Sequence, residues 1–304
     1  MPTSSYRISE VLDGLLISGD RAVAPAATPD LLIEVPHGAT KTSDFHAFES
    51  ALRSPLPANL VDFFHVNTDA GAPELAEAIA REVVRAEPSR VTLVIRCRIP
   101  RTFIDCNRRI DAKPEEFREG KVTPGLLPWI TTPEDRALLQ NRYQAYTSHV
   151  RAITGSLRAD GAILLLHTYA PRTVDVEVDL EIVANLRRAW QPDMETTWPL
   201  RPEIDFITRA IDGTSFAPTV VAEALRAELY AIGITAADSA TYPLHQSTLA
   251  WEHVTGHPGR ALCVEVRRDL LADRWQPFSE MRIGAQRVAK LATPFANAVR
   301  HWWR

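Results

Sequence analysis

Short runs of apolar and β-branched residues recur along the chain, and each run gives way to polar residues. The runs lie at 31–35, 61–66, 91–95, 162–166 and 261–266. Their length and composition predict buried strands. Segments with helical periodicity lie between or after them, at 43–52, 73–87, 133–157, 217–232 and about 277–303. Strands that alternate with helices predict an α/β fold with a largely parallel sheet.

The remaining segments give weaker signals. Residues 1–30 look peripheral, with a helix start at Ser9 and a loop at 22–30. Alternation of apolar and acidic residues over 171–183 predicts an edge strand, and 246–251 read as an extended polar segment. Residues 110–132 lack a regular pattern, and a loop of that length usually serves a site.

Composition and charge exclude several classes of partner. The chain has 34 basic and 38 acidic residues, a net charge of −4, which does not predict binding to nucleic acid or to a membrane surface. No apolar run approaches the roughly 18 residues of a membrane helix, and the N-terminus lacks the features of a signal peptide. Cys97, Cys106 and Cys263 form no disulfide pattern, so we expect a cytoplasmic protein.

Polar residues stand at the ends of three predicted strands. His37 follows the first run within Pro36-His37-Gly38, Asp69 follows the second, and His167 follows the fourth. Ligand crevices of open α/β sheets lie just past the carboxyl ends of strands. Two histidines and a carboxylate form a zinc-type ligand set, which in an enzyme leaves a position open. A histidine that only stabilises a turn is the alternative for each position.

The stretch after the third strand concentrates polar chemistry. Arg101, Asp105, Asn107, Arg108 and Arg109 fall within nine positions, just beyond a proline that ends the strand. Arg108 offers a planar fork for a carboxylate, Asn107 can donate to the same ligand, and Asp105 can hold an arginine in place. A charged surface loop is the alternative interpretation.

The last predicted strand carries Glu265 inside an apolar run. A buried carboxylate must be paired or functional, and a raised pKa would suit it to general base catalysis. Arg267 and Arg268 follow and could neutralise it, so a purely structural pair with Arg267 is the alternative. Cys106, between Asp105 and Asn107, is expected to point into the core rather than to act as a nucleophile.

The order of these elements over residues 31 to 268 resembles the N-formylglutamate amidohydrolase family, and more distantly aspartoacylase and the zinc carboxypeptidases. The carrying elements are Pro36-His37-Gly38, Asp69, Arg101-x3-Asp105-x-Asn107-Arg108, His167 and Glu265. The resemblance implies a three-layer α/β/α fold with a mixed, mostly parallel sheet of eight strands and one zinc or other divalent ion. We expect a single catalytic domain over 1–304, with 110–132 and 171–257 as insertions that wall the site.

The resemblance also implies roles for these residues. His37, His167 and a carboxylate would hold the metal. The carboxypeptidase-type relatives carry a glutamate three residues after the first histidine, where this chain has Thr40. Asp69 is therefore the expected carboxylate, with Asp44 and Glu34 as the alternatives. Glu265 would be the general base and Arg101 the oxyanion stabiliser. Substrate would be bound by Asn107, Arg108, Asp105 and Thr248. His245, His253 and His257 are weaker candidates.

The implied function is hydrolysis of an N-formyl or other small N-acyl group from an acidic amino acid such as N-formylglutamate, releasing formate and the amino acid. One alternative is a zinc peptidase or deacylase for a larger N-acyl amino acid or a γ-glutamyl-type amide. Another is a non-catalytic carboxylate-binding protein on the same fold. A nucleotide enzyme is disfavoured because no GxGxxG or Walker element follows any strand.

Overall fold

The computed structural model describes residues 3–19 and 28–304, and within them eight strands form one sheet. The strands are β1 (Thr3–Ser9), β2 (Leu12–Ser18), β3 (Leu31–Val35), β4 (Val91–Cys97), β5 (Ala162–Tyr169), β6 (Ile204–Phe206), β7 (Ala236–Asp238) and β8 (Ala261–Arg267). Their order across the sheet is β1-β2-β4-β3-β5-β8-β6-β7. The central four, β4, β3, β5 and β8, run parallel, while β1, β2 and β6 join antiparallel to their inner neighbours. The predicted mixed, mostly parallel sheet is confirmed.

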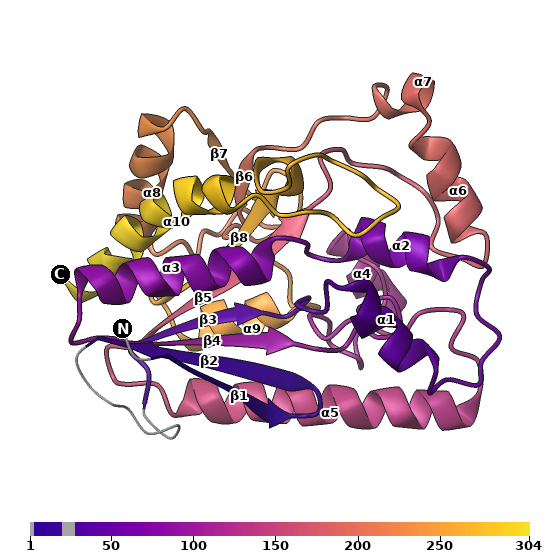
Figure 1. Ribbon diagram of the computed structural model, residues 1–304, viewed down its shortest axis with the longest axis horizontal. Coiled ribbons are helices and arrows are strands. Elements are labelled where there is room, and N and C mark those ends of the chain that lie inside the picture. The colour runs from indigo at the N-terminus through magenta and orange to yellow at the C-terminus, as the bar shows by residue number, and fades with distance from the viewer. Residues whose placement is uncertain (1–2, 20–27) are drawn as a thin grey trace.

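Helices cover both faces of this sheet, as Figure 1 shows. They are α1 (Thr42–Glu49), α2 (Leu60–Asn67), α3 (Ala72–Ala86), α4 (Pro114–Glu119), α5 (Pro133–Gly155), α6 (Ile182–Ala189), α7 (Pro192–Glu195), α8 (Thr219–Ala231), α9 (Leu249–Gly256) and α10 (Ala285–Val299), with 3₁₀ turns η1 (Arg268–Leu270) and η2 (Arg300–Trp303). No helix among the described residues is both long and apolar enough to cross a bilayer.

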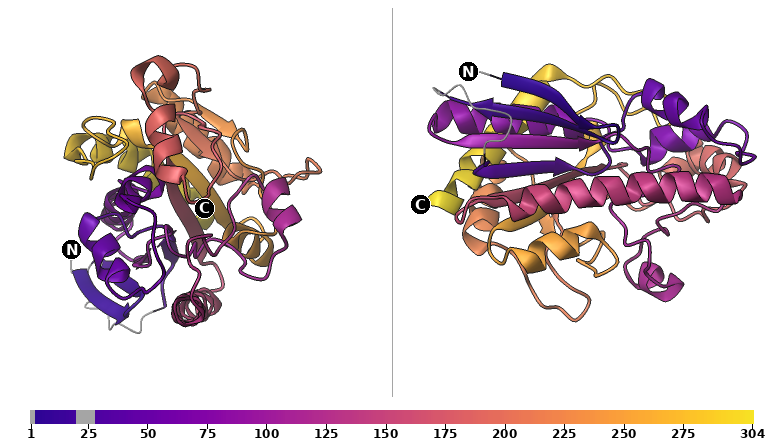
Figure 2. Two further views of the ribbon diagram at one scale, coloured as in Figure 1. Left: turned by 90° about the vertical axis from the view of Figure 1, so that its right-hand side faces the viewer. Right: turned by 90° about the horizontal axis from the view of Figure 1, so that it is seen from below.

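Alternating side chains of the central strands divide the core into two layers. On β5, Leu164 and Leu166 pack with residues of α3, α8 and α10. Ile163 and Leu165 face the other way, toward α5 and α9. Figure 2 shows α5 running along its own face of the sheet. The three-layer arrangement follows from the period of two along each strand, because both sets of side chains are apolar. His167 and Glu265 lie on the α5 and α9 side, beyond the apolar part of their strands.

The run at 61–66 is helix α2 rather than the predicted strand. Its side chains are buried on almost every side, including Leu60, Phe63, Phe64 and Val66. A short run that is apolar all round fits a buried helix as well as a buried strand, so its composition alone could not decide between them. Asp69 therefore follows a helix, and α3 begins at Ala72, just after it.

The N-terminal segment also differs from its prediction. Instead of a helix start at Ser9, β1 and β2 form a hairpin that extends the sheet beyond β4. The predicted loop at 22–30 falls outside the described residues up to position 27. β1 lies at the edge of the sheet, and a strand there is buried on fewer sides, which leaves it a weaker apolar signature.

Three further boundaries differ from the predictions. Residues 171–181 form no strand, although inward Val174, Val176 and Val178 alternate with exposed acidic neighbours. Helix α9 starts at Leu249, within the segment predicted to be extended. The final helix begins at Ala285, not near 277, because the chain from 271 to 284 forms turns closed by a bridge between Ala272 and Ile283.

Candidate metal centre and substrate cavity

Parallel strands bring the candidate residues to one edge of the sheet. His37 lies two residues past β3, and His167 and Glu265 are directly paired positions on neighbouring β5 and β8. The segment after β4 delivers Arg101, Asp105, Asn107 and Arg108. Parallel strands end at the same edge, so residues from four separate stretches of sequence meet there.

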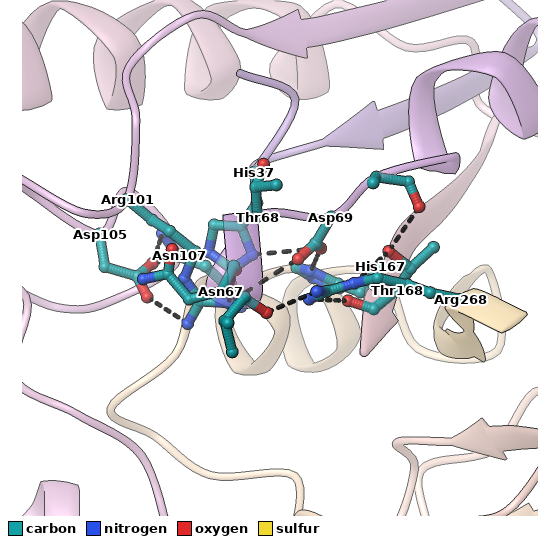
Figure 3. A network of polar contacts seen from close by, with 12 residues as sticks. His37, Asn67, Thr68, Asp69, Arg101, Asp105, Asn107, His167, Thr168 and Arg268 are labelled. Carbon is teal, nitrogen blue, oxygen red and sulfur yellow. Dashed lines mark hydrogen bonds and ion pairs between the residues drawn. The ribbon is translucent and has the colours of Figure 1, made fainter. Parts of the chain in front are cut away.

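The two histidines and Asp69 form a compact buried cluster (Figure 3). His37 Nδ1 lies 3.2 Å and His167 Nδ1 2.9 Å from the same oxygen, Asp69 Oδ2. Ligand atoms of the three residues all lie within 4.8 Å of one another. Burial alone would raise the pKa of Asp69, but the adjacent His37 and His167 outweigh it and hold that pKa below its usual range.

This donor set fits a divalent metal ion. Bonds of about 2.0–2.1 Å in a tetrahedral zinc site place neighbouring ligand atoms roughly 3.4 Å apart, close to the distances seen here. Asp69 Oδ1 is buried without a hydrogen bond, although it lies 3.7 Å from Arg101. Imidazole nitrogen and carboxylate oxygen are the donor atoms zinc prefers outside thiolate sites. His37, Asp69 and His167 are therefore the residues that could hold a metal.

Asp105 fixes the orientation of His37. Its Oδ1 accepts a hydrogen bond from His37 Nε2 at 2.7 Å and another from the backbone N–H of Asn107 at 2.9 Å. Because a carboxylate only accepts, Nε2 carries the proton and Nδ1 keeps its lone pair for a metal, which assigns the tautomer from the network. Although burial opposes it, the charges of Arg101 and Arg108 and the hydrogen bond from His37 keep the pKa of Asp105 well below its usual range.

Arg101 links the two buried carboxylates. Its Nη2 lies 2.7 Å from Asp105 Oδ2, and its Nη1 lies 3.7 Å from Asp69 Oδ1. Burial disfavours the charged form, but Asp105 and Asp69 outweigh it and raise the pKa of Arg101. Its side chain also reaches the cavity, so a permanent positive charge faces any carbonyl oxygen bound beside the cluster.

Glu265 has the surroundings expected of a general base. Its Oε2 is buried without a hydrogen bond to any described residue, and the side chain lines the cavity. Burial raises the pKa of Glu265 to about 7, with His167 acting in the opposite direction. The alternative pair with Arg267 does not form, because Arg267 bonds Asp269 at 2.8 Å and the Arg201 carbonyl at 2.9 Å.

The cavity has a volume of about 660 Å³. Asn107 and Arg108 line it, and Asn107 Oδ1 is buried there without a partner. Some N–H groups of Arg108 already have partners, since Nε donates to the Thr123 carbonyl and Nη1 to the Asn107 carbonyl. Thr248 bridges to Arg108 through the backbone and also lines the cavity.

The other candidates lie outside the cluster. Asp44 Oδ2 caps α1 and pairs with Arg96 at 2.6 Å. Glu34 is buried between the Tyr146 hydroxyl at 2.5 Å and His253 Nε2 at 2.7 Å. Asp69 is therefore the carboxylate that reaches both histidines. In addition, His245 bonds Ser247 and His257 bonds the His253 carbonyl. Cys106 is buried, as expected, and burial raises the pKa of its thiol.

Arg268 has a positioning role that the sequence did not reveal. Its guanidinium donates to the Val66 carbonyl near the end of α2 and to both oxygens of Thr168 on β5. It therefore ties the segment that carries Asp69 to the strand that carries His167. Burial lowers the pKa of Arg268 to about 10, against Asp69, which raises it. Contacts to backbone atoms depend on the fold, so no spacing in the sequence signals them.

Solved structures share this fold over nearly the whole chain. An N-formylglutamate amidohydrolase from Ralstonia eutropha JMP134 is 17% identical with a TM-score of 0.58, covering 95% of this chain and 98% of its own. A gene product from Agrobacterium tumefaciens is 14% identical with a TM-score of 0.55, covering 97% and 95%. A comparison with curated proteins gave no match.

The mixed sheet, with polar side chains and a metal-ligand cluster at its carboxyl edge, defines the class as an α/β protein with a candidate metal centre. The chain belongs to the N-formylglutamate amidohydrolase family, whose family model matches residues 30–272. This match confirms the resemblance drawn from the sequence and makes the chain an amidohydrolase. The roles of individual site residues remain predictions.

Proposed function

We propose that this protein is a metal-dependent amidohydrolase, most simply a zinc enzyme, that removes an N-formyl or other small N-acyl group from an acidic amino acid such as N-formylglutamate. One observation carries the proposal. The His37, Asp69 and His167 donor atoms converge beside a cavity that also receives an unpartnered Glu265 oxygen and the Arg101 guanidinium.

His37, Asp69 and His167 would hold the ion. When bound, a divalent ion supplies Lewis acidity that acidifies a water molecule and polarises an amide carbonyl. Glu265 accepts the proton of the attacking water and later donates it to the leaving amine, which is work suited to a carboxyl with a pKa near neutrality. Arg101 stabilises negative charge on the carbonyl oxygen, because its own charge is fixed in place by Asp105.

Asn107 and Arg108 position the substrate through its α-carboxylate. Asn107 retains an unpartnered oxygen and hence an amide group free to reorient toward ligand, while Arg108 keeps N–H groups beyond its two backbone contacts. Holding the carboxylate in the same cavity as the metal cluster aligns the scissile amide, so that binding energy is used to orient the substrate.

The cavity walls support the proposal of one catalytic domain over 1–304. Phe117, Lys121 and Thr123 come from the 110–132 segment, whereas Val176 and Tyr242 come from the 171–257 segment. Both segments therefore contribute to substrate selection. We expect substrates to be small amides that bear a carboxylate, with no nucleic acid or membrane partner and a cytoplasmic location.

A larger N-acyl group is a second candidate because one part of the cavity is apolar. Phe63 and Val66 of α2, together with Ile182 and Leu186 of α6, line it with the inward valines of 174–178. A formyl group would leave much of this surface without contact, whereas a longer acyl chain would bury it at about 25 cal/mol per Å².

A substrate panel tests both candidates. Zinc-loaded protein is assayed for amino acid release from N-formyl-, N-acetyl-, N-butyryl- and N-benzoyl-L-glutamate, with each reaction repeated after chelation. The proposal predicts chelator-sensitive hydrolysis with the highest kcat/KM for the formyl or acetyl compound. A maximum at the butyryl or benzoyl compound would favour the second candidate, and no hydrolysis of any member would refute both.

A further inference from the structure

The cavity is strongly cationic in a chain whose overall charge is −4. Seven arginine and lysine side chains line it, but only two carboxylates do, Asp175 and Glu265. Arg101 and Arg108 have Asp105 as a counter-ion, and Arg118 pairs with Glu115. The other four cationic side chains that line the cavity form no ion pair with a carboxylate of the described residues, which favours a substrate with more than one negative charge.

Arg201 is the one of these cations whose guanidinium lies over aromatic rings. Its guanidinium carbon lies 5.0 Å from the centre of the Tyr169 ring and 5.6 Å from that of Tyr242. Nε donates to the Thr173 hydroxyl at 3.1 Å, and Nη2 to the Tyr242 hydroxyl at 3.1 Å. Among the described residues, no carboxylate lies within 4.0 Å of the Arg201 guanidinium, and Arg201 Nη1 makes no hydrogen bond.

The backbone of Arg201 is held as firmly as its side chain. Its amide donates to the Pro171 carbonyl at 2.9 Å, and its carbonyl accepts from Arg267 at 2.9 Å. The Tyr169 hydroxyl in turn donates to the Pro202 carbonyl at 2.7 Å, which fixes the ring under the guanidinium. An arginine ordered in this way loses little further conformational freedom when it binds an anion.

Arg201 and Arg108 reach the cavity from different parts of the fold. Arg108 follows β4, whereas Arg201 precedes β6, and these strands lie on opposite sides of β3, β5 and β8 in the sheet order. A substrate held at both points would therefore span the strands that carry the metal cluster and Glu265. Two cationic anchoring points favour a substrate with two anionic groups.

We propose that Arg201 is a specificity-determining residue that binds the side-chain carboxylate of a dicarboxylic N-acyl amino acid, while Asn107 and Arg108 bind its α-carboxylate. The inference rests on the proposed function and deepens it, since it names the residue that distinguishes an acidic side chain from a neutral one. Tyr169 and Tyr242 act by holding the Arg201 guanidinium in place.

The test compares N-formyl-L-glutamate with N-formyl-L-glutamine, which has the same shape but lacks the second charge. Arg201→Met should lower kcat/KM for the glutamate compound by about 10- to 100-fold, the value of one charge-assisted contact, and change the glutamine compound by less than about threefold. Arg201→Lys should fall between, because it keeps the charge but loses the planar fork.

Arg172→Met is the matched control. Arg172 also lines the cavity and donates to the Trp198 carbonyl, and within the described part of the chain it has neither an acidic partner nor the aromatic contacts of Arg201. It should leave the ratio of glutamate to glutamine rates within about threefold of wild type. Equal losses for the two substrates in Arg201→Met, or the same discrimination loss in Arg172→Met, would overturn the assignment.

Calorimetric binding of both compounds to the zinc-loaded Glu265→Gln variant, with and without Arg201→Met, gives a readout that does not need turnover. Preferential binding of the glutamate compound that vanishes with Arg201→Met supports the role of Arg201 even if wild-type protein hydrolyses neither compound. Lack of any preference with Arg201 present contradicts the inference even if hydrolysis occurs. The two failures are thereby distinguished.

Discussion

Replacing Asp105 by asparagine should weaken metal binding and destabilise the fold at once. The carboxylate accepts from His37 and the Asn107 amide on one oxygen, and from Arg101 on the other, with Arg108 at 3.5 Å. An asparagine side chain has only one accepting oxygen. Whichever way the amide turns, its NH₂ group faces either the His37 proton or the Arg101 guanidinium.

The size of both effects follows from these contacts. Loss of the carboxylate that orients a metal-binding histidine typically weakens affinity by about 10- to 100-fold. Removal of one partner from a buried ion pair costs about 3–5 kcal/mol, and we expect the lower end, about 3 kcal/mol, because Arg101 stays partly exposed. The exposed pair of Asp111 with Arg109 provides a control, because Asp111→Asn makes the same chemical change six residues away.

Metal affinity is measured by competition with a chromophoric chelator, and stability by urea unfolding of the metal-free protein. Asp105→Asn should show both losses, and Asp111→Asn should lie within about 0.5 kcal/mol of wild type. If Asp105→Asn bound zinc as tightly as wild type, the orienting role of Asp105 would be refuted. If the variant had the same urea midpoint of unfolding as wild type, the buried ion pair of Asp105 with Arg101 would contribute nothing to the stability of the fold.

Three other predictions follow from the site and the fold. Glu265→Gln should keep stoichiometric metal by elemental analysis yet lower kcat by about 10²- to 10⁴-fold, whereas a wild-type rate would exclude a general base role. His167→Ala should lose metal and hydrolysis together, and retention of metal would place the site elsewhere. Asp135 accepts backbone N–H groups of Arg53 and Ser54, which outweigh burial and lower its pKa. The ionised Asp135 carboxylate stabilises the fold above the pKa of the unfolded chain, near 4, and this stabilisation is lost as the pH falls. Asp135→Asn should therefore lower the free energy of unfolding in urea by about 1–3 kcal/mol at pH 7 and by less at pH 3. An equal loss at both pH values would contradict this.

The central sheet could be predicted because its strands are buried on both faces. β3, β4, β5 and β8 give continuous apolar runs, and polar side chains near their carboxyl ends mark the site edge. Asp69 lies beside both histidines, although it follows helix α2 and not the predicted strand. Asp69 lies close to the histidines because distant segments of the chain fold together, and no local sequence pattern reveals such a contact.

Other features could not be read from the sequence because they depend on backbone contacts between distant segments. Arg268 acts through the carbonyls of Val66 and Thr168, and Arg201 is ordered by Tyr169 and Tyr242. Both arginines lie in stretches without a recognisable motif. The valines at 174–178 alternate as in a strand, yet no neighbouring strand pairs with them in the described sheet.

The central claim is that one metal ion held by His37, Asp69 and His167 is required for amide hydrolysis. The most direct measurement is a zinc titration of chelator-stripped protein, with formate release from N-formylglutamate recorded at each step. The account predicts no release from the stripped protein and a linear rise that stops at one ion per chain. Full activity in the stripped protein, or no activity after one ion per chain is bound, would contradict it.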